Sequence, residues 1–182
     1  QMKQQSSFAG WDFFTIWDIV EGQTYPFFKS GVGTGTPDDP YRIATKADLL
    51  AMAADTADYN KCFIVTADID MEGQVFTTAI IAANTGVSLA FQGTAFTGTF
   101  DGNGHKITNF TINGGSNSCL GLFGWIDFGG SVQNLGLENF TVSGTGDFVG
   151  GLVGGNGGTI SNSNSTGEVS GSSYYVCGLV GD

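Results

Sequence analysis

The sequence predicts an all-β protein built as a parallel β-helix, or solenoid, and two repeated patterns support that prediction. The tetrapeptide Gly-Leu-Phe/Val-Gly occurs at residues 121–124, 151–154 and 178–181, with offsets of 30 and then 27 positions. A second pattern repeats in phase with the first, from Ser131 to Asn134 and again from Thr159 to Asn162. Short apolar strands punctuated by Gly and Asn, at a period of about 20 to 50 residues, are typical of solenoids and propellers.

The repeat length favours a solenoid, because one propeller blade needs about 40 residues. Glycines beside each repeated Leu permit tight corners and a close approach of backbones. Asn134 and Asn162 are either a hydrogen-bonded ladder at a turn or plain surface turn residues, and the sequence leaves both readings open. Stacked coils are expected to place two sets of side chains in interior columns: Leu122, Leu152 and Leu179 in one, Val132 and Ile160 in the other.

Upstream of the repeats the pattern changes to one convincing helix. Thr45 and Asp48 have the spacing of a capping box, followed by an apolar stretch that predicts a helix of about ten residues. Such a helix suits the open end of a solenoid core, which needs an atypical terminal element. We expect strands at residues 62–65 and 96–100, with a turn at residues 101–104. The role of residues 77–95 is open.

The chain is accordingly divided into three predicted segments. Residues 1–30 form a Trp-rich, tail-like segment of a preceding or neighbouring solenoid block. Residues 31–60 form an initial turn and the capping helix, and residues 61–182 form the β-helix coils. Gln1 leads directly into polar sequence without a signal peptide, so an exported protein is expected to be present here in a mature or excised form.

Composition excludes several classes of partner. Only 13% of the residues are charged and the net charge is −11, with six Lys and Arg in all. No basic patch for nucleic acid or an anionic membrane can be assembled from so few cations. No apolar run approaches the roughly 20 residues that span a bilayer, so membrane insertion is not expected. The three cysteines match no zinc spacing, and we expect Cys62, Cys119 and Cys177 to be buried free thiols.

The upstream motifs resemble a known group of proteins. They are Gly33–Ile43, Asp48-Leu49-Leu50, Ala67–Met71 and Phe96–Ile107. Together with the Gly-Leu-Phe/Val-Gly segments they resemble bacterial and archaeal cell-surface proteins with GLUG repeats, which also occur as accessory regions of IgA-cleaving metallopeptidases. The resemblance implies a right-handed parallel β-helix on a secreted or surface-attached protein, and it implies no catalytic residues.

The order of parts departs from that resemblance. The segment containing Trp11, Trp17 and Tyr25 looks like the one that normally follows the last coil, yet here it comes first. The chain reaches Asp182 just after a repeat, and an uncovered coil exposes strand edges. We therefore expect self-association through the solenoid ends, the Trp-rich segment of one chain meeting the Gly178–Asp182 edge of another. Such a contact need not close and can produce a filament.

Candidate catalytic and metal sites are weak in this sequence. His105 is the only histidine and lies in a turn, and no HExxH motif is present. Asp68, Asp70 and Asp101 lack the spacing of a calcium loop and are expected to cap turns. We therefore expect no enzyme activity, no catalytic residues, no cofactor and no metal. The expected function is that of an extracellular structural protein: a surface-layer, fibre or filament subunit.

Two alternatives remain open at this point. A carbohydrate-active enzyme would need carboxylates with basic partners in a groove, and the carboxylates of the repeat region are expected to lack them: Asp127, Glu138, Asp147, Glu168 and Asp182. An adhesin could bind glycan or protein through the aromatic residues Trp125, Phe128, Tyr174 and Tyr175. Three N-glycosylation sequons begin at Asn109, Asn139 and Asn164, and they mean little if the source is prokaryotic.

Overall fold

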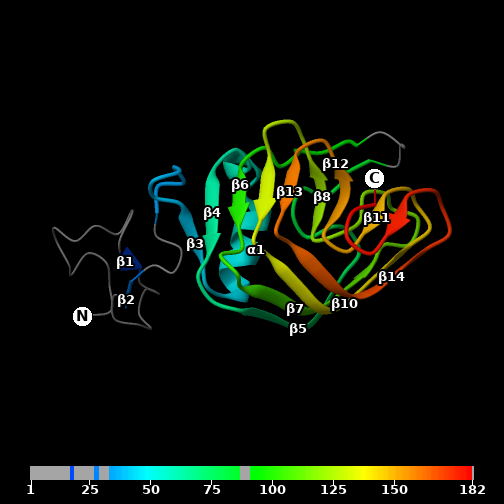
Figure 1. Ribbon diagram of the computed structural model, residues 1–182, viewed down its shortest axis with the longest axis horizontal. Coiled ribbons are helices and arrows are strands. Elements are labelled where there is room, and N and C mark those ends of the chain that lie inside the picture. The colour runs from blue at the N-terminus through cyan, green and yellow to red at the C-terminus, as the bar shows by residue number, and fades with distance from the viewer. Residues whose placement is uncertain (1–16, 19–26, 29–32, 87–90, 182) are drawn as a thin grey trace.

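The computed structural model describes residues 17–18, 27–28, 33–86 and 91–181 of the chain (Figure 1). Most of the predicted Trp-rich segment, including Trp11 and Tyr25, lies outside the described residues. Within it, β1 (Trp17–Asp18) and β2 (Phe27–Phe28) pair in antiparallel fashion. Every other pair of strands in the described ranges is parallel, and the one α-helix among them is short. The prediction of an all-β protein is confirmed.

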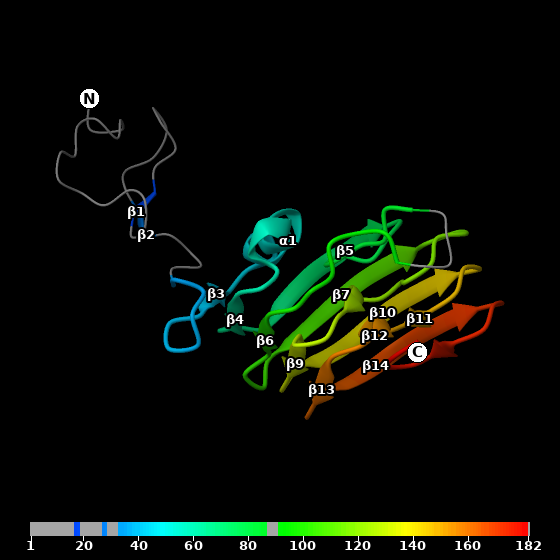
Figure 2. The same ribbon diagram turned by 90° about the horizontal axis from the view of Figure 1, so that it is seen from above.

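Three sets of parallel strands build the protein, and the chain visits them repeatedly in the same order. The first is a five-stranded sheet: β3 (Tyr41–Ile43), β4 (Cys62–Val65), β6 (Thr99–Asp101), β9 (Ser131–Gln133) and β13 (Thr159–Ser161). The second has four strands: β5 (Ile69–Phe76), β7 (Lys106–Asn113), β10 (Gly136–Gly144) and β14 (Asn164–Gly171). The third contains two pairs: β8 (Phe123–Ile126) with β12 (Val153–Asn156), and β11 (Val149–Gly150) with β15 (Val176–Cys177). Figure 2 shows the strands of successive passes lying side by side.

Two strands of the second sheet, β7 and β10, share one bend. Ile107, Phe110 and Ile112 of β7 point into the core, and this alternation is interrupted by one extra residue, Asn109, whose φ is 60°. Asn139 holds the same place in β10 with φ 51°. Asparagine tolerates this left-handed conformation better than most residues, so it can supply the bend without a large strain. The apolar side chains on both sides of the bend therefore reach the same core.

The predicted interior columns are confirmed. Leu122 and Leu152 are fully buried, and backbone hydrogen bonds link each repeat to the next, such as Phe123 N–H to the Leu152 carbonyl at 2.8 Å. Val132 pairs with Ile160 in the first sheet. Phe110 and Phe140 stack in the second sheet with ring centroids 5.4 Å apart. The final repeat differs, because Leu179 and Ile160 are only half-buried there.

The predicted helix is α1 (Lys46–Ala54), and its capping box is present. The Thr45 hydroxyl accepts from Asp48 N–H, and the Asp48 carboxylate accepts from Thr45 N–H at 2.9 Å. The helix contacts β3 and β5, the end strands of the first and second sheets, and buries Leu49 against them. It covers this end of the core, and a short 3₁₀ turn (Thr56–Asp58) follows it. No helix in the described ranges is long and apolar enough to cross a membrane.

Two expectations about local structure need correction. The strand expected at residues 96–100 is displaced to β6, because the amides of Thr97 and Gly98 both bond to the Tyr59 carbonyl and turn the chain there. The thiols are free, as expected, but only Cys119 is buried, while Cys62 is half-buried and Cys177 is exposed. Cys177 lies in the last pass, where no further strand covers it in the described structure.

Residues 77–95 contribute to the third set of strands. Ile81 forms a bridge with Phe123, and Phe96, directly after the segment, forms one with Ile126, so the chain joins the stack that contains β8 at both places. Tyr59 fixes its start, since the Tyr59 hydroxyl accepts from Ala82 N–H at 3.0 Å and donates to the Ala53 carbonyl at 2.7 Å. The described part of the segment thus fills the place of a third strand in an early pass.

Candidate functional site

His105 is paired with Asp68 at the corner between the first and second sheets. Its Nδ1 lies 3.0 Å from Asp68 Oδ1, and the same oxygen accepts from Lys106 N–H at 3.1 Å. These hydrogen bonds hold the pKa of Asp68 below its ordinary value. The pair joins two successive corners and contains no nucleophile, so its geometry supports a structural role.

The other predicted turn carboxylates also cap turns. Asp101 accepts hydrogen bonds from Gln133 Nε2 at 2.8 Å, Asn134 Nδ2 at 3.0 Å and Asn103 N–H at 2.7 Å. Burial raises the pKa of Asp101, but these three hydrogen bonds outweigh it and the pKa falls below its ordinary value. Among the described residues, no three His, Cys, Asp or Glu side chains are placed to hold a metal ion.

Two polar ladders cross the strands on the outer surface. Asn162 Nδ2 donates to Asn134 Oδ1 at 3.3 Å, and Asn134 donates in turn to Asp101, so of the two readings that the sequence left open the ladder is the one present. A second ladder was not expected. In it Asn139 Nδ2 donates to Asn109 Oδ1, and Asn109 Nδ2 donates to Asp70 Oδ1 at 2.8 Å. The spacing of 30 residues between Asn109 and Asn139 was the signal that could have revealed it.

The carboxylates of the repeat region do not converge on one groove. Asp127 caps Phe128 N–H at 2.7 Å, and Asp147 accepts from the Ser173 hydroxyl. The expectation that these carboxylates lack a basic partner is wrong for Glu138, because Lys106 Nζ lies 2.7 Å from Glu138 Oε1. Parallel register brings Lys106 beside β10, although 32 positions separate the two residues in the sequence. Asp182 lies outside the described residues.

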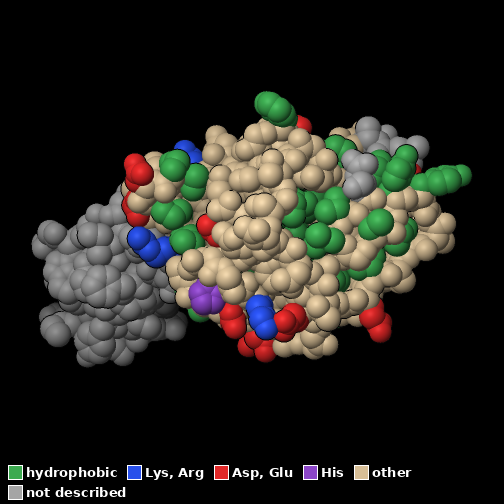
Figure 3. All heavy atoms as spheres, in the orientation of Figure 1, with side chains coloured by type: hydrophobic (Ala, Val, Ile, Leu, Met, Phe, Trp, Pro, Cys, Tyr) green, Lys and Arg blue, Asp and Glu red, His purple; other side chains and the backbone are tan. Residues whose placement is uncertain are grey.

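Aromatic residues form a chain of ring contacts on the third set of strands. Phe91 stacks on Trp125 with centroids 5.5 Å apart, Trp125 meets the edge of Phe148, and Phe148 stacks on Tyr175 at 5.0 Å. Hydrophobic side chains gather on the surface where β8, β11 and β12 lie (Figure 3). Tyr174 is 80% exposed and available for contact, whereas Trp125 is half-buried by its neighbours.

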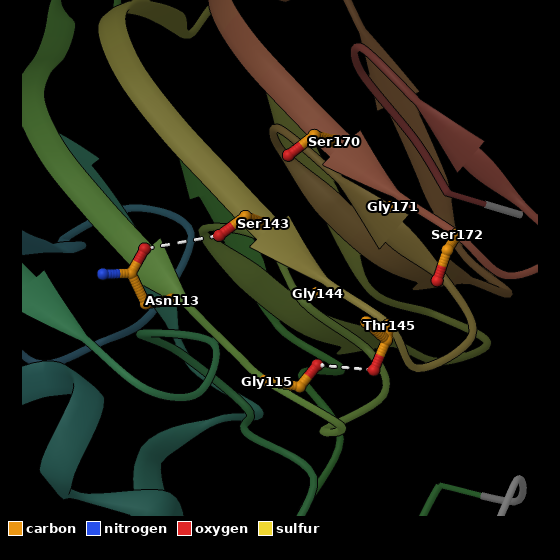
Figure 4. A pocket seen from close by; sticks show the side chains of 8 residues that line it. All are labelled: Asn113, Gly115, Ser143, Gly144, Thr145, Ser170, Gly171 and Ser172. Atoms are coloured by element: carbon orange, nitrogen blue, oxygen red, sulfur yellow. Dashed lines mark hydrogen bonds between the residues drawn. The ribbon is translucent and has the colours of Figure 1, made fainter.

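A shallow groove of about 450 Å³ lies at the carboxyl ends of β7, β10 and β14 (Figure 4). Ser143 Oγ donates to Asn113 Oδ1 at 3.3 Å, and Thr145 Oγ1 donates to the Gly115 carbonyl at 3.1 Å. Its lining is uncharged and made of small residues: Asn113, Gly115, Ser143, Gly144, Thr145, Ser170, Gly171 and Ser172. These contacts tie successive passes together.

The final pass presents a free edge in the described structure. Strands β13, β14 and β15 each have a neighbour on one side only. Gly178–Gly181, the described part of the predicted docking edge, lies in this pass. Of its predicted counterparts, Trp11 and Tyr25 lie outside the described residues, as does the side chain of Trp17.

The chain is similar to parts of two much longer proteins. It is 36% identical over 157 residues to Halomucin of Haloquadratum walsbyi, an alignment that covers 82% of this chain and 2% of that protein. It is also 36% identical over 134 residues to a Gly-rich membrane protein of Evansella cellulosilytica, covering 71% of this chain and 15% of that protein. No solved structure matches it. No protein-family model matches the chain either, so the resemblance to GLUG-repeat proteins is carried by its motifs alone.

Proposed function

We propose that this chain is a non-catalytic structural part of an extracellular, cell-surface protein. In this proposal it folds as a right-handed β-solenoid and stacks head to tail through the ends of the solenoid. The parallel, in-register passes and the sparse charge support it. The names of the two relatives, Halomucin and a Gly-rich membrane protein, support a place at the cell surface.

The open space around Gly178 is the main support for stacking. A Cβ built at Gly151 would overlap the Gly178 carbonyl oxygen and lie 2.6 Å from Phe140 Cζ, so the next pass forces glycine at that position. Gly178 holds the matching place in the following repeat, yet a Cβ there would meet nothing within 4 Å and its φ is not in the left-handed region. Contacts within the described residues do not require glycine at 178. A further pass stacked on this edge would require it, as it does at Gly151.

The burial pattern supports the same conclusion. The interior columns are fully buried at Leu122, Leu152 and Val132, whereas Leu179 and Ile160, which continue them, are half-buried. Apolar side chains beside free strand edges favour pairing with another polypeptide. A second copy of this chain, or a further repeat of the same kind, has the matching backbone pattern. Repeated end-to-end contact of this type builds a surface layer, fibre or filament.

The test replaces Gly178 with valine. Gly178→Val adds a side chain in open space, so we expect the thermal midpoint of the isolated chain to be unchanged. Self-association, measured by sedimentation velocity and electron microscopy at rising concentration, should be lost because the side chain blocks the next pass. Thr159→Val is the matched control on the same edge, since Thr159 lies on the outward face of β13 and should leave association intact. An unmodified chain that stays monomeric at high concentration contradicts stacking between copies.

A second candidate is an adhesin module, which the exposed aromatic residues favour. Tyr174 is 80% exposed and Phe128 is 90% exposed, and aromatic faces of this kind bind sugar rings or protein surfaces. A glycan array probed with the native chain and with Tyr174→Ala tests this role. Binding that is lost in the variant supports it, and an array without any binder excludes glycans as the ligand.

A further inference from the structure

The three N-glycosylation sequons lie in matching strands of the second sheet. They begin at Asn109 in β7, Asn139 in β10 and Asn164 in β14. In each, the middle residue points inward, as the burial of Phe110 and Phe140 shows, and Ser165 Oγ bonds inward to the Gly178 carbonyl at 2.8 Å. The Asn and the Thr two positions later therefore share the outward face. The sequence alone does not distinguish the three sequons, but the hydrogen bonds of their asparagine side chains do.

The side-chain amides of two of the three asparagines already make hydrogen bonds within the fold. Asn109 Nδ2 donates a charge-assisted hydrogen bond to Asp70 Oδ1 at 2.8 Å, and Asn109 Oδ1 accepts from Asn139 Nδ2. Both asparagines also hold the left-handed bend of their strands. A sugar on either nitrogen would replace one of its two amide hydrogens and place a bulky ring beside the neighbouring side chain, which would disturb the ladder. The folded chain thus protects these two sequons.

Asn164 makes none of these side-chain hydrogen bonds and does not hold a left-handed bend. It is exposed, and within the described residues its side chain makes no hydrogen bond; its backbone N–H bonds to the Leu135 carbonyl at 3.0 Å. The neighbour opposite it in β10 is Gly136, which adds no side chain, and a Cβ there would lie 3.7 Å from Asn164 Oδ1. Thr166 is also exposed on the same face. An incoming enzyme therefore meets a free amide with its hydroxyl partner beside it.

We propose that Asn164 is the N-glycan acceptor of the folded chain and that Asn109 and Asn139 are not. In the transfer, Asn164 Nδ2 forms a bond to the anomeric carbon of an oligosaccharide carried on a lipid pyrophosphate. The bond between that carbon and the phosphate oxygen breaks, the lipid pyrophosphate leaves with its electron pair, and the amide loses one proton to a base of the transferase. The glycan projects from the outward face of β14, the strand at the free edge, and the proposal concerns the chain before any further pass stacks on that edge.

The test uses the folded chain with an oligosaccharyltransferase and a lipid-linked oligosaccharide. The transferase is first selected for activity on three synthetic peptides, one spanning each sequon, so that each sequence is a proven acceptor. Intact mass and peptide mapping should then show one glycan on the folded chain, attached to Asn164. Asn164→Gln should lose the entire mass shift, whereas Asn109→Gln, confirmed as folded by circular dichroism, should keep it.

The denatured chain is the control for the role of the fold. It should be modified at Asn109 and Asn139 as well, because unfolding breaks the ladder that protects them. The proposal is overturned if the folded chain remains unmodified at Asn164, or if it is glycosylated at Asn109 or Asn139. Equal modification of the three sites in folded and denatured chains would also overturn it.

Discussion

Truncating two leucines of one interior column measures how well each pass of the chain is covered. Leu152 and Leu179 hold matching places in consecutive repeats, but Leu152 is fully buried between two passes and Leu179 is half-buried at the free edge. Leu→Ala at a fully buried site costs roughly 2 to 5 kcal/mol, so about 3 kcal/mol of unfolding free energy is expected to be lost in Leu152→Ala. Leu179 is partly exposed, so Leu179→Ala removes less buried surface, and its cost is expected to be smaller, about 2 kcal/mol.

Urea unfolding followed by circular dichroism at low protein concentration gives both values. Linear extrapolation applies if the slope is unchanged between variants, which also checks that repeats do not unfold separately. At concentrations where copies stack, the cost of Leu179→Ala should rise towards that of Leu152→Ala, because association buries the side chain. Equal costs in the dilute monomer would refute the reasoning, since they would mean that the last pass is covered without a partner.

Three further predictions concern the cap, a corner carboxylate and the thiols. Thr45→Ala removes the side-chain acceptor for Asp48 N–H and should lower the unfolding free energy by about 1 kcal/mol in urea; an unchanged midpoint would show that the cap contributes nothing. Asp101 has a lowered pKa, so its contribution is present above its unfolded pKa and is lost as pH falls through its folded pKa. Thermal midpoints of native chain and Asp101→Asn should therefore converge as the pH is lowered, and a constant gap would contradict this. Burial, with a smaller effect from Asp147, raises the pKa of Cys119 to about 11, so at pH 8 a maleimide should label exposed Cys177 first and leave Cys119 unlabelled until urea is added; early labelling of Cys119 would refute its burial.

Local chemistry explains which features could be predicted from the sequence. The capping box at Thr45 and Asp48 depends on residues three positions apart, so the sequence alone contains it. The interior columns follow from the repeat, because residues at matching places must meet when passes stack in register, whereas the repeat left Asn134 and Asn162 open between a ladder and plain surface turns. The prediction of the columns needed only the period of the pattern.

The features that were missed depend on where a pass begins and ends. The Lys106–Glu138 ion pair needs the register between β7 and β10, and the role of Ile81 needs the path of residues 77–95 around the core. The asparagines of the second ladder resemble sequons in the sequence, and only the left-handed bend at Asn109 and Asn139 shows their structural use. A short apolar segment also has no fixed boundary in sequence, which is why β6 was misplaced.

By itself the sequence determined the all-β class, the period of the passes and the side chains that face the core, because glycine spacing and alternation act locally and repeat. The tertiary structure decided which polar side chains are hydrogen-bonded to neighbouring strands and which are exposed. It commits Asn109 and Asn139 to neighbouring strands and leaves Asn164 exposed, and it forces glycine at 151 while leaving open space at 178. The physical reason is that a residue's freedom depends on the pass above and below it, and those neighbours lie about 30 positions away in the chain.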